Sequence, residues 1–557
     1  MTELLTAAGM RALEAGAIAR GRVTGLELME RAGRGVVEAI GAAWPERGGG
    51  GLPAPRTPRE YFGQDEGGRA ARAVVLCGPG NNGGDGFVVA RLLGGAGWDV
   101  AVLLYGDPAR LPPDARTNLA RWQAMGEVVA LGFPDLSAEG IAALRRAWGR
   151  DDPVDLVVDA IFGTGLARPA DALGALFDHA RELREAAGTR VVAVDVPTGL
   201  CADSGRLYPP GPLQRGPEAV IRADLTVTFH RPRIGHHLGE GPACCGRLAV
   251  ADIGLEGEAD GDGPAAAAAV RLLPPEGGVP ALARSGRGHK YSHGHALILA
   301  GPPGHGGAAR LAARGALRIG AGLVTVGAPA GAMAEHAAQL NAVMLREIGT
   351  GAALEAALAA DGRIGALCIG PGLGVDARGR GLVAAALAGR RACVLDADAL
   401  TLVAREPALR AALHGGCVLT PHAGEFARLF PDIAARLEAP PARGPAFSKV
   451  DAARAAAAGA GCVVLLKGAD TVIAGPEGRA AVSSAAYDRA APWLATAGSG
   501  DVLAGFVAGL LARGFAPAAA AETAAWLHVD CALAFGPGLI AEDLPEMLPR
   551  VFGRLGL

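Results

Sequence analysis

The sequence predicts two successive α/β domains. The chain has 557 residues, which is too long for one hydrophobic core. Continuously apolar segments, typical of buried parallel strands, alternate with helical patterns, and this rhythm occurs twice along the chain. A stretch rich in Gly, Ala and Asp at 254–269 separates the two runs, so we place the boundary near residue 260.

The first domain is expected over residues 1–255 as a Rossmann-like, doubly wound three-layer sandwich. Its strand candidates alternate with helical segments, as in open sheets that carry helices on both faces. A Gly- and Pro-rich stretch at 48–68 interrupts this pattern and is expected to be a flexible insertion. The five apolar segments expected as strands are 73–78, 99–106, 155–163, 190–197 and 224–230.

The second domain is expected over residues 280–557, after a linker at 256–279. Six strand-plus-turn units precede a glycine turn that runs into an apolar helix at 498–514. The alternation again indicates an α/β fold. The six units are 295–301, 322–329, 366–372, 393–400, 417–425 and 462–468.

Composition excludes several classes of function. The net charge of −3 and the lack of a basic stripe with interleaved aromatic residues argue against a nucleic-acid partner. Half of the residues are apolar, yet no run of 18 or more uncharged apolar residues occurs and the first residues do not resemble a signal peptide. We therefore expect a soluble cytoplasmic protein with no membrane partner. The nine cysteines form no CxxC pair, so reduced thiols are expected.

Lysine is rare in this chain. Only Lys290, Lys449 and Lys467 occur among 53 basic residues. A lysine kept against such a bias is expected to act as a compact, mobile charge that arginine cannot replace. Lys290 lies in a Gly- and Ser-rich histidine loop, HKYSHG, which we interpret as a substrate loop rather than a metal site.

The motif PGNNGGDG at 79–86 joins the first strand to a helix. The amides at a helix N-terminus attract anions, and glycines let a phosphate approach the backbone closely. Gly80, Gly83, Gly84 and Gly86 are the glycines of this motif. The motif therefore predicts a nucleotide-phosphate loop, with a tight turn capped by Asn and Asp as the alternative.

Two later strands of the first domain end in carboxylates. Asp159 closes LVVDA and Asp195 closes VVAVD. With Asn82 and Thr198 they offer oxygen ligands suited to a hard cation. Each acid alone is also compatible with a helix cap or a turn.

The motifs PGNNGGDG, VDAIFGTGL, VDVPTGL and VTFHRPRIGHHLG resemble the NAD(P)H-hydrate epimerase domain, in order, over nearly all of residues 1–255. The resemblance implies interconversion of the R and S forms of hydrated NADH and NADPH. Thr198 stands where that family usually has Ser, and Arg233 stands where it has Lys. The resemblance implies Asp195 as the catalytic residue at the nicotinamide end, and a potassium site formed by Asn82, Asp159 and Thr198. The implied substrate-binding residues are Asn81, Asn82, Gly83, Gly84, Asp85, Gly163, Thr164, Gly165, Leu166, Ala167, Arg168, Pro169 and Asp195.

The second domain carries ATAGSGDVLAGFVAGLL, a glycine turn that opens a helix. Amides of the first turn can form an anion hole for a transferring phosphoryl group, and Asp501 can take a proton from an acceptor hydroxyl. A simple interaction of Asp501 with the helix dipole is the alternative. About 30 residues upstream, LLKGADT places Lys467 and Thr471 after a buried strand.

These motifs, with IGPGLG, LDADAL and LTPHAGEFARL, resemble the ribokinase-like fold and, within it, the ADP/ATP-dependent NAD(P)H-hydrate dehydratase domain over about residues 280–550. The resemblance implies that the nucleotide phosphorylates the hydroxyl of the hydrate and that phosphate then leaves. His422 either pairs with dinucleotide phosphates or caps the helix that follows Pro421. The implied hydrate contacts are Ala308, Gly374, His422 and the catalytic Asp501. The implied adenine-nucleotide contacts are Lys467, Gly468, Ala469, Asp470, Thr471 and Gly500.

The sequence therefore predicts a bifunctional repair enzyme for hydrated NADH and NADPH. Its expected cofactors are K⁺ in the epimerase domain and Mg²⁺ in the dehydratase domain, with ADP or ATP as co-substrate. A homo-oligomer is expected. Two alternatives are a ribokinase-like small-molecule kinase fused to a nucleotide-binding domain, and a non-enzymatic nucleotide sensor or scaffold. The choice between ADP and ATP stays open, with ADP favoured.

Overall fold

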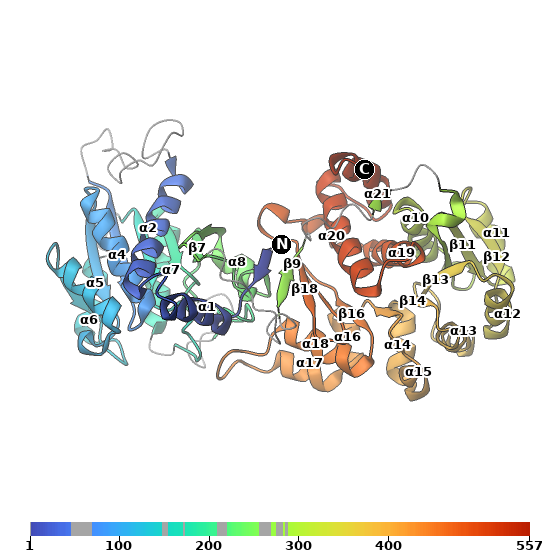
Figure 1. Cartoon of the computed structure of the whole chain (residues 1–557), viewed down its shortest axis with the longest axis horizontal. Helices are drawn as coiled ribbons and strands as arrows, with labels where there is room; N and C mark the ends of the chain where they lie inside the picture. The colour runs from blue at the N-terminus through green and yellow to red at the C-terminus, as the bar shows by residue number, and fades with distance from the viewer. Residues whose placement is uncertain are drawn as a thin grey trace. The chain divides into compact units, whose positions relative to one another are not determined.

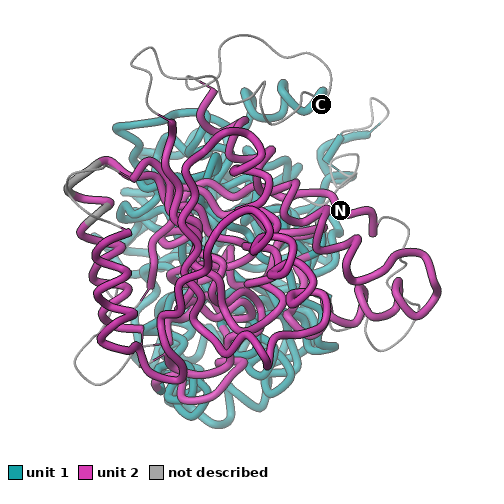
Figure 2. The backbone as a smooth tube through the Cα atoms, turned by 90° about the vertical axis from the view of Figure 1, so that its left-hand side faces the viewer, with its two compact units in different colours: residues 1–3, 262–439, 449–557 teal, residues 4–261, 440–448 magenta. Residues whose placement is uncertain are grey.

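The chain folds into two compact units. The computed structural model describes residues 2–45, 70–147, 154–170, 173–208, 220–255, 269–273, 282–283 and 288–557, and the insertion expected at 48–68 lies outside these ranges. We call Leu4–Gly261 with Pro440–Ser448 the N-terminal unit (magenta in Figure 2). The C-terminal unit comprises Met1–Glu3, Asp262–Ala439 and Lys449–Leu557 (teal).

The N-terminal unit contains a seven-stranded sheet in the order β4-β3-β2-β5-β6-β7-β8. All neighbouring strands pair in parallel. The chain order reverses between β2 and β5, and such a switch point opens a ligand crevice beyond the carboxyl ends of the strands. The strands are β2 (Arg72–Cys77), β3 (Asp99–Leu104), β4 (Val128–Ala130), β5 (Leu156–Ala160), β6 (Arg190–Val194), β7 (Leu225–Phe229) and β8 (Arg247–Ala251).

Helices cover both faces of this sheet (Figure 1). Alternate residues of β2 point to opposite faces: Val75 joins the core under α2, α4 and α5, whereas Val74 joins the core with α6 and α7. The predicted doubly wound three-layer sandwich is therefore confirmed. The helices are α1 (Ala7–Ala19), α2 (Gly25–Ala43), α4 (Asn81–Gly95), α5 (Pro113–Gln123), α6 (Ala138–Ala147), α7 (Gly174–Ala187) and α8 (Gly241–Cys245).

The C-terminal unit is built on an eleven-stranded sheet in the order β1-β9-β18-β17-β16-β15-β14-β13-β10-β11-β12. Strands β10 to β16 pair in parallel, and β16, β17 and β18 form an antiparallel meander. The strands are β1 (Thr2–Leu4), β9 (Val270–Leu272), β10 (His295–Leu299), β11 (Leu323–Ala328), β12 (Met344–Glu347), β13 (Ile364–Ile369), β14 (Ala392–Leu395), β15 (Cys417–Leu419), β16 (Val463–Leu466), β17 (Asp470–Ala474) and β18 (Ala480–Ser484). Strand β9 lies within the stretch 256–279 that was expected to be a linker.

Two helices of the C-terminal unit pack backbone to backbone. A Cβ on Gly505 would lie 2.1 Å from the carbonyl oxygen of Ala312, and one on Gly509 would lie 2.7 Å from that of Ala316. Glycine is required at such close approaches. Helix α10 therefore fixes the position of α19, whose first turn carries the GSGD motif. The helices of this unit are α10 (Gly307–Arg318), α11 (Met333–Ala337), α12 (Gly351–Ala360), α13 (Ala377–Ala388), α14 (Ala397–Arg405), α15 (Pro407–Ala411), α16 (Ala423–Leu429), α17 (Pro431–Glu438), α18 (Lys449–Ala460), α19 (Ser499–Ala512), α20 (Pro517–Phe535) and α21 (Asp543–Arg554).

In the described part of the chain, all nine cysteines are buried and none forms a disulfide. Within the same residues, every helix is too short or too polar to cross a lipid bilayer.

Candidate active sites

The PGNNGGDG motif forms the turn between β2 and α4, and Gly80 is the N-cap of the helix. Three of its glycines are packed closely against other parts of the protein. Cβ atoms on Gly83, Gly84 and Gly86 would lie 2.1, 2.5 and 2.7 Å from other protein atoms. A Cβ on Gly80 would meet nothing within 4 Å. Gly86 thus lets α4 pack closely against β5, and the open space at Gly80 leaves room for an anion at the helix N-terminus.

Asp195 follows β6 at the same edge, and three hydrogen bonds hold its carboxylate in place. Its φ is +66°, in the left-handed region, where Asp and Asn are the best-tolerated side chains after glycine. The Thr164 amide donates to Oδ2 over 3.1 Å, and the Thr228 hydroxyl donates to Oδ1 over 2.9 Å. Arg233 Nη2 also donates to Oδ1, over 3.3 Å. Strained backbone with a fully engaged carboxylate is typical of a functional site.

A second layer of charged groups surrounds Asp195. Arg233 is 0% exposed and also donates to the carbonyl oxygens of Arg231 and Phe229. The His236 ring lies 3.0 Å from the Asp195 carbonyl oxygen, and burial lowers the pKa of His236 to about 4. Burial raises the pKa of Glu14, and the Asp195 charge adds to this shift. The neighbourhood of Asp195 thus contains the guanidinium of Arg233, the neutral imidazole of His236 and the carboxyl group of Glu14.

Asp85 lies on α4, just after its first turn. Burial raises its pKa well above the ordinary range, and the negative charges of Asp195 and Glu14 add to this shift. A carboxyl group with a raised pKa is suited to donate a proton near neutral pH. The site therefore contains the hydrogen-bonded carboxylate of Asp195 and, on α4, a second carboxyl group whose pKa is raised.

Asp159 and Thr198 form a buried pair at the ends of β5 and β6. The Thr198 hydroxyl donates to Asp159 Oδ1 over 2.6 Å, and the Thr198 amide donates to Oδ2 over 2.7 Å. The Phe162 amide donates to the Thr198 hydroxyl oxygen over 3.0 Å. Burial raises the pKa of Asp159 to about 6, partly offset by the hydrogen bonds from Thr198. In the orientation that satisfies its amide, Asn82 accepts from Gly163 and donates to the Val194 carbonyl oxygen, both over 3.2 Å.

The loop 163–169 connects these groups to a cavity of about 720 Å³. Within the loop, the Thr164 amide binds Asp195, and the residues from Gly165 onward line the cavity wall. Arg11 of α1 donates to the Thr164 carbonyl oxygen over 3.3 Å. A ligand whose reacting end lies at Asp195 can therefore extend into this cavity.

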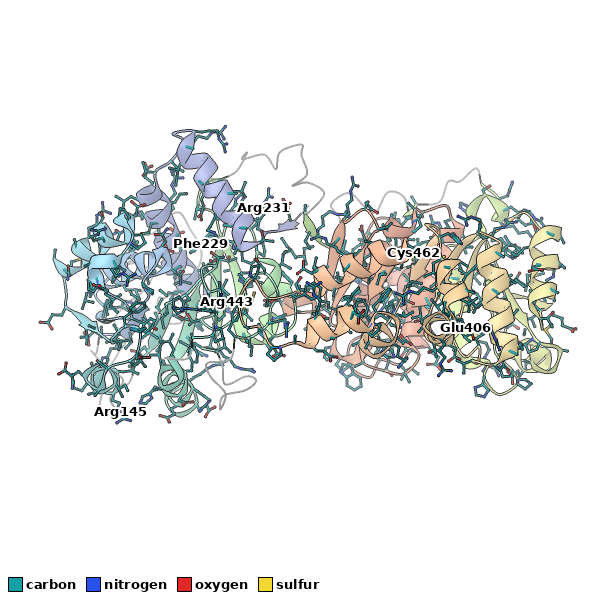
Figure 3. The ribbon with its side chains drawn as sticks, turned by 90° about the horizontal axis from the view of Figure 1, so that it is seen from below. Arg145, Phe229, Arg231, Glu406, Arg443 and Cys462 are labelled. Carbon is teal, nitrogen blue, oxygen red and sulfur yellow. The ribbon has the colours of Figure 1, made fainter. Side chains whose placement is uncertain are left out.

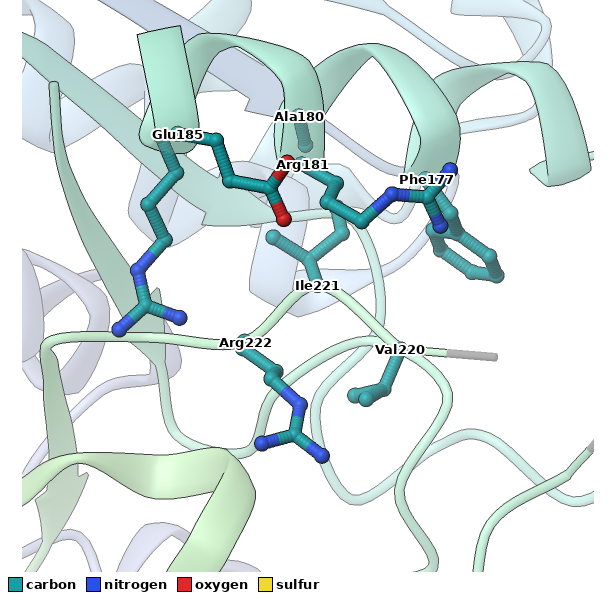
Figure 4. Close-up of a pocket in the computed structure, with 8 residues that line it drawn as sticks. Phe177, Ala180, Arg181, Glu185, Val220, Ile221 and Arg222 are labelled. Carbon is teal, nitrogen blue, oxygen red and sulfur yellow. The ribbon is translucent and has the colours of Figure 1, made fainter. Parts of the chain in front are cut away.

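Another cavity of the N-terminal unit, of about 600 Å³, lies between α7 and the segment 220–222 (Figure 4). It is lined by Arg181, Arg184 and Arg222 together with Glu185, and Arg184 is ion-paired with Asp224 over 2.9 Å. None of the predicted site residues lines it, so we do not assign it to the site.

In the C-terminal unit, Asp501 lies in the first turn of α19, after Gly498 with a φ of +87°. Burial raises the pKa of Asp501 to about 6; the charge of Asp396 adds to the shift and that of Lys467 opposes it. Lys467 Nζ donates to Asp396 Oδ1 over 2.8 Å and lies 3.8 Å from Glu425 Oε2. A Cβ on Gly500 would lie 3.5 Å from Lys467 Nζ. The structure thus brings the lysine of LLKGADT to the start of the GSGD helix.

The turn 467–471 is closed by its own hydrogen bonds. The Gly468 amide donates to Thr471 Oγ1 over 3.2 Å, and the Thr471 hydroxyl donates to the Gly468 carbonyl oxygen over 2.8 Å. Lys449 Nζ donates to Asp470 Oδ1 over 2.6 Å and to the Lys467 carbonyl oxygen over 3.2 Å. Lys449, the second of the three lysines, therefore holds both ends of this turn through hydrogen bonds.

The remaining predicted hydrate contacts lie at neighbouring strand ends. A Cβ on Gly372, in the IGPGLG loop, would lie 3.7 Å from that of Ala308. The Gly374 amide donates to Asp398 Oδ2 over 2.8 Å. His422 is the N-cap of α16, where its Nδ1 accepts from the amides of Gly424 and Glu425, and its side chain is 56% exposed. The capping alternative for His422 is thus present in the structure, with most of the ring still accessible.

The HKYSHG loop does not lie at this site, which corrects its interpretation as a substrate loop. It immediately precedes β10, at the amino ends of the strands. A Cβ on Gly294 would lie 1.7 Å from the carbonyl oxygen of Ala512, the last residue of α19, whereas Asp501 is in its first turn. Lys290 lies over the ring of Tyr291, 5.2 Å from its centre.

Sequence reasoning did not single out Glu14, His236 or Asp396, which contact or influence the two acids. No local pattern marks Glu14, because it reaches Asp195 from a separate helix. The signal for Lys449 was its rarity alone.

Together, the two units define an enzyme of the nucleotide-handling α/β class with two separate acid-containing sites at the carboxyl ends of parallel strands. A family model described as YjeF-related protein N-terminus matches residues 25–235, and one described as NAD(P)H-hydrate dehydratase matches residues 296–548. The chain belongs to the family of bifunctional NAD(P)H-hydrate repair enzymes, as its full-length relatives show.

A bifunctional NAD(P)H-hydrate repair enzyme Nnr of Moorella thermoacetica is 37% identical over 573 residues, covering 99% of this chain and 97% of the relative. The Escherichia coli enzyme of the same name is 32% identical, covering 94% of this chain and 89% of the relative. An NAD(P)H-hydrate epimerase of Rhodobacter capsulatus is 43% identical over 240 residues, which cover 42% of this chain and 92% of the relative. A Bacillus subtilis ADP/ATP-dependent NAD(P)H-hydrate dehydratase, co-crystallized with ATP/Mg²⁺, is 28% identical with a TM-score of 0.42, covering 51% of this chain and 98% of that one.

Proposed function

We propose that this chain repairs hydrated NADH and NADPH in two steps. The N-terminal unit interconverts the R and S hydrates. The C-terminal unit transfers a phosphoryl group from ADP or ATP to the hydroxyl of the S hydrate, and loss of that phosphate restores the dihydronicotinamide. The observation that carries the proposal is that each unit presents a carboxylate beside a helix N-terminus at the carboxyl edge of its sheet: Asp195 is buried and Asp501 is half-buried. The small-molecule kinase alternative is not favoured, because repair enzymes match nearly the whole chain.

In the epimerase site, Asp195 is the proposed proton acceptor at the hydrated carbon. Thr164 and Thr228 hold its two oxygens in place, and Arg233 donates a further hydrogen bond to Oδ1. Asp85 on α4, with its raised pKa, is suited to supply a proton. The rest of the predicted set, in the first turn of α4 and the loop 163–169, binds the dinucleotide.

The donor set at Asp159 fits a potassium ion. A carboxylate, the Thr198 hydroxyl and the Asn82 amide supply oxygen ligands, and the Phe162 carbonyl oxygen lies 3.4 Å from the Thr198 hydroxyl. A bound cation would balance the charge of the buried Asp159 carboxylate, which is otherwise costly. These residues would hold the ion, which would supply positive charge next to the substrate phosphates. Thr198 keeps the hydroxyl that this role needs.

In the dehydratase site, Asp501 is the proposed base that accepts the proton of the hydrate hydroxyl. The α19 amides stabilise the transferring phosphoryl group. Lys467 and the turn 467–471 bind the adenine nucleotide, with Gly500 close to the lysine. Ala308, Gly374 and the exposed His422 ring line the approach of the hydrate.

Magnesium fits this site as an ion carried by the nucleotide. Mg²⁺ is usually held by substrate phosphates with one or two carboxylates rather than by an all-protein cage. Among the described residues no cluster of three or more metal-ligating side chains occurs. Asp396 and Glu425 beside Lys467 are the carboxylates that would face the ion. The metal would supply charge neutralisation between the phosphates.

The two activities are tested separately on the full chain. The R hydrate is incubated without nucleotide, and chromatography follows the appearance of the S form. The S hydrate is then supplied with ADP or ATP, and the return of reduced-nicotinamide absorbance is compared with phosphate release. A phosphorylated sugar or pyrimidine product without repair of the hydrate would contradict the proposal. A cytoplasmic, homo-oligomeric enzyme is part of the proposal, and light scattering measures the oligomeric state.

A further inference from the structure

The segment Pro440–Ser448 joins α17 to α18, yet it packs within the N-terminal unit. Ala446 is buried in the core under α6 and α7. The Gly444 amide donates to the Ala167 carbonyl oxygen over 2.7 Å, and Arg206 donates to the Phe447 carbonyl oxygen over 3.4 Å. The segment 440–448, which follows the TPHAGE motif in the sequence, is thus hydrogen-bonded to the loop 163–169 that is predicted to bind the dinucleotide.

This contact requires glycine at position 444. A Cβ there would lie 2.1 Å from the Tyr208 hydroxyl oxygen and 3.1 Å from the Ala167 Cα. Tyr208 is fully buried, so it has no room to move aside. The segment is therefore closely packed against the loop 163–169.

Arg443, labelled in Figure 3, contributes to the wall of the 720 Å³ cavity. Arg168 lines the same cavity, and the remaining charged lining residue is Asp135. Both arginines are exposed, and within the described residues neither forms an ion pair. Two guanidinium groups against one carboxylate give the cavity a net positive charge, which suits a phosphate-bearing ligand.

Aromatic rings form another part of the cavity wall. The ring centre of Tyr105 lies 5.4 Å from that of Phe133 and 6.0 Å from that of Phe162. Such rings offer apolar faces and edges to a flat heterocycle. The cavity volume lies within the usual range of small-molecule sites.

Asp195 does not line this cavity, but Thr164, whose amide binds Asp195, immediately precedes the cavity-lining Gly165 in the chain. A dinucleotide with its reacting ring at Asp195 therefore has its second nucleotide available for the cavity. We propose that the cavity binds the adenosine-phosphate half of the hydrated dinucleotide, and that Arg443, from the C-terminal half of the sequence, is a phosphate-binding residue of the epimerase site. This inference rests on the proposed epimerase function.

The test compares Arg443→Ala with Arg405→Ala in the full chain, because Arg405 is an exposed arginine at the far end of α14. R hydrates are supplied without adenine nucleotide, so that only epimerisation is measured. Loss of a charged hydrogen bond predicts that Arg443→Ala raises KM for NADH hydrate by about tenfold with little change in kcat. Arg405→Ala is expected to match the parent. Dehydration of the S hydrate with ADP or ATP is expected to be unchanged in both variants.

Shortened and extended substrates locate the phosphate. The hydrate of reduced nicotinamide mononucleotide lacks the adenosine half, so we expect its KM to be the same in parent and Arg443→Ala. A larger KM effect with NADPH hydrate than with NADH hydrate assigns Arg443 to the 2′-phosphate, and an equal effect assigns it to the 5′-phosphate of the adenosine half.

Gly444→Ala tests the packing of the segment independently. We expect it to raise the same KM, and Tyr208→Phe to restore part of the loss by removing the clashing hydroxyl. If the parent epimerises and Arg443→Ala has the same KM as the parent for both dinucleotide hydrates, the inference about Arg443 is wrong but the proposed function still stands. An equal KM rise with the mononucleotide hydrate also overturns the inference. A parent that does not epimerise overturns the proposed function and this inference together.

Discussion

Asp195→Asn separates the chemical role of the carboxylate from its structural role. Asparagine keeps the size of the side chain and tolerates the φ of +66°, so the backbone adds no new strain. It removes the negative charge that faces Arg233, which is 0% exposed. Leaving a buried charge without its partner costs about 3–5 kcal/mol. We therefore expect the N-terminal unit to lose several kcal/mol of unfolding free energy.

Loss of the proton-accepting group has its own effect on rate. General acid–base catalysis contributes about 10²–10⁴-fold, so we expect epimerisation by the folded variant to fall by that factor. The assay follows conversion of the R to the S hydrate by chromatography, with urea unfolding in parallel.

The matched variant is Asp195→Asn combined with Arg233→Met. Removing both charges is expected to restore most of the stability, because the buried cation no longer lacks a partner. Activity is expected to stay low. Recovery of epimerisation in the double variant, or a parent rate in Asp195→Asn, would refute the catalytic role.

Three further predictions concern other parts of the chain. Burial raises the pKa of Asp501 to about 6, and the proposed base must be ionised to accept a proton. We therefore expect the rate of dehydration at saturating nucleotide to be constant above this pH and to fall below it. A rate that stays constant down to pH 5, about one unit lower, would contradict this role. Gly505→Ala places a Cβ 2.1 Å from the Ala312 carbonyl oxygen, so we expect it to lower the free energy of unfolding in urea by about 1–3 kcal/mol. The control is Gly459→Ala on α18, where the added Cβ meets open space, and we expect it to be neutral or stabilising. Equal stabilities of the two variants would show that α10 and α19 are not closely packed. Potassium is expected to raise the melting temperature of the N-terminal unit in the parent and in Thr198→Ser but not in Thr198→Ala, since binding to the folded state stabilises it; a potassium effect that survives in Thr198→Ala would exclude the hydroxyl as a ligand.

The fold followed from the sequence because its signals are local. Continuous apolar runs such as 73–78 and 190–197 became β2 and β6, and the glycine motifs became the starts of α4 and α19. Strand ends at one sheet edge also brought Asp159 and Asp195 to neighbouring positions, as the alternation of strands and helices predicts.

The surroundings of the acids did not follow from the sequence, because they depend on long-range packing. Glu14 and Arg233 reach the Asp195 neighbourhood from opposite ends of the N-terminal unit. Arg443 comes from a segment with no motif of its own, more than 200 residues after the loop that it approaches. The HKYSHG loop was wrongly predicted to bind substrate. Its composition suggested a substrate loop, but it precedes β10 and therefore lies at the amino ends of the strands, away from the site.

The most direct test of the account supplies an equal mixture of R and S hydrated NADH with ADP or ATP and follows the return of reduced-nicotinamide absorbance. We predict complete conversion by the parent chain and, in Asp195→Asn, a rapid phase that stops at the S fraction. Conversion that stops at the S fraction in the parent, or that runs to completion equally fast in the variant, would contradict the account.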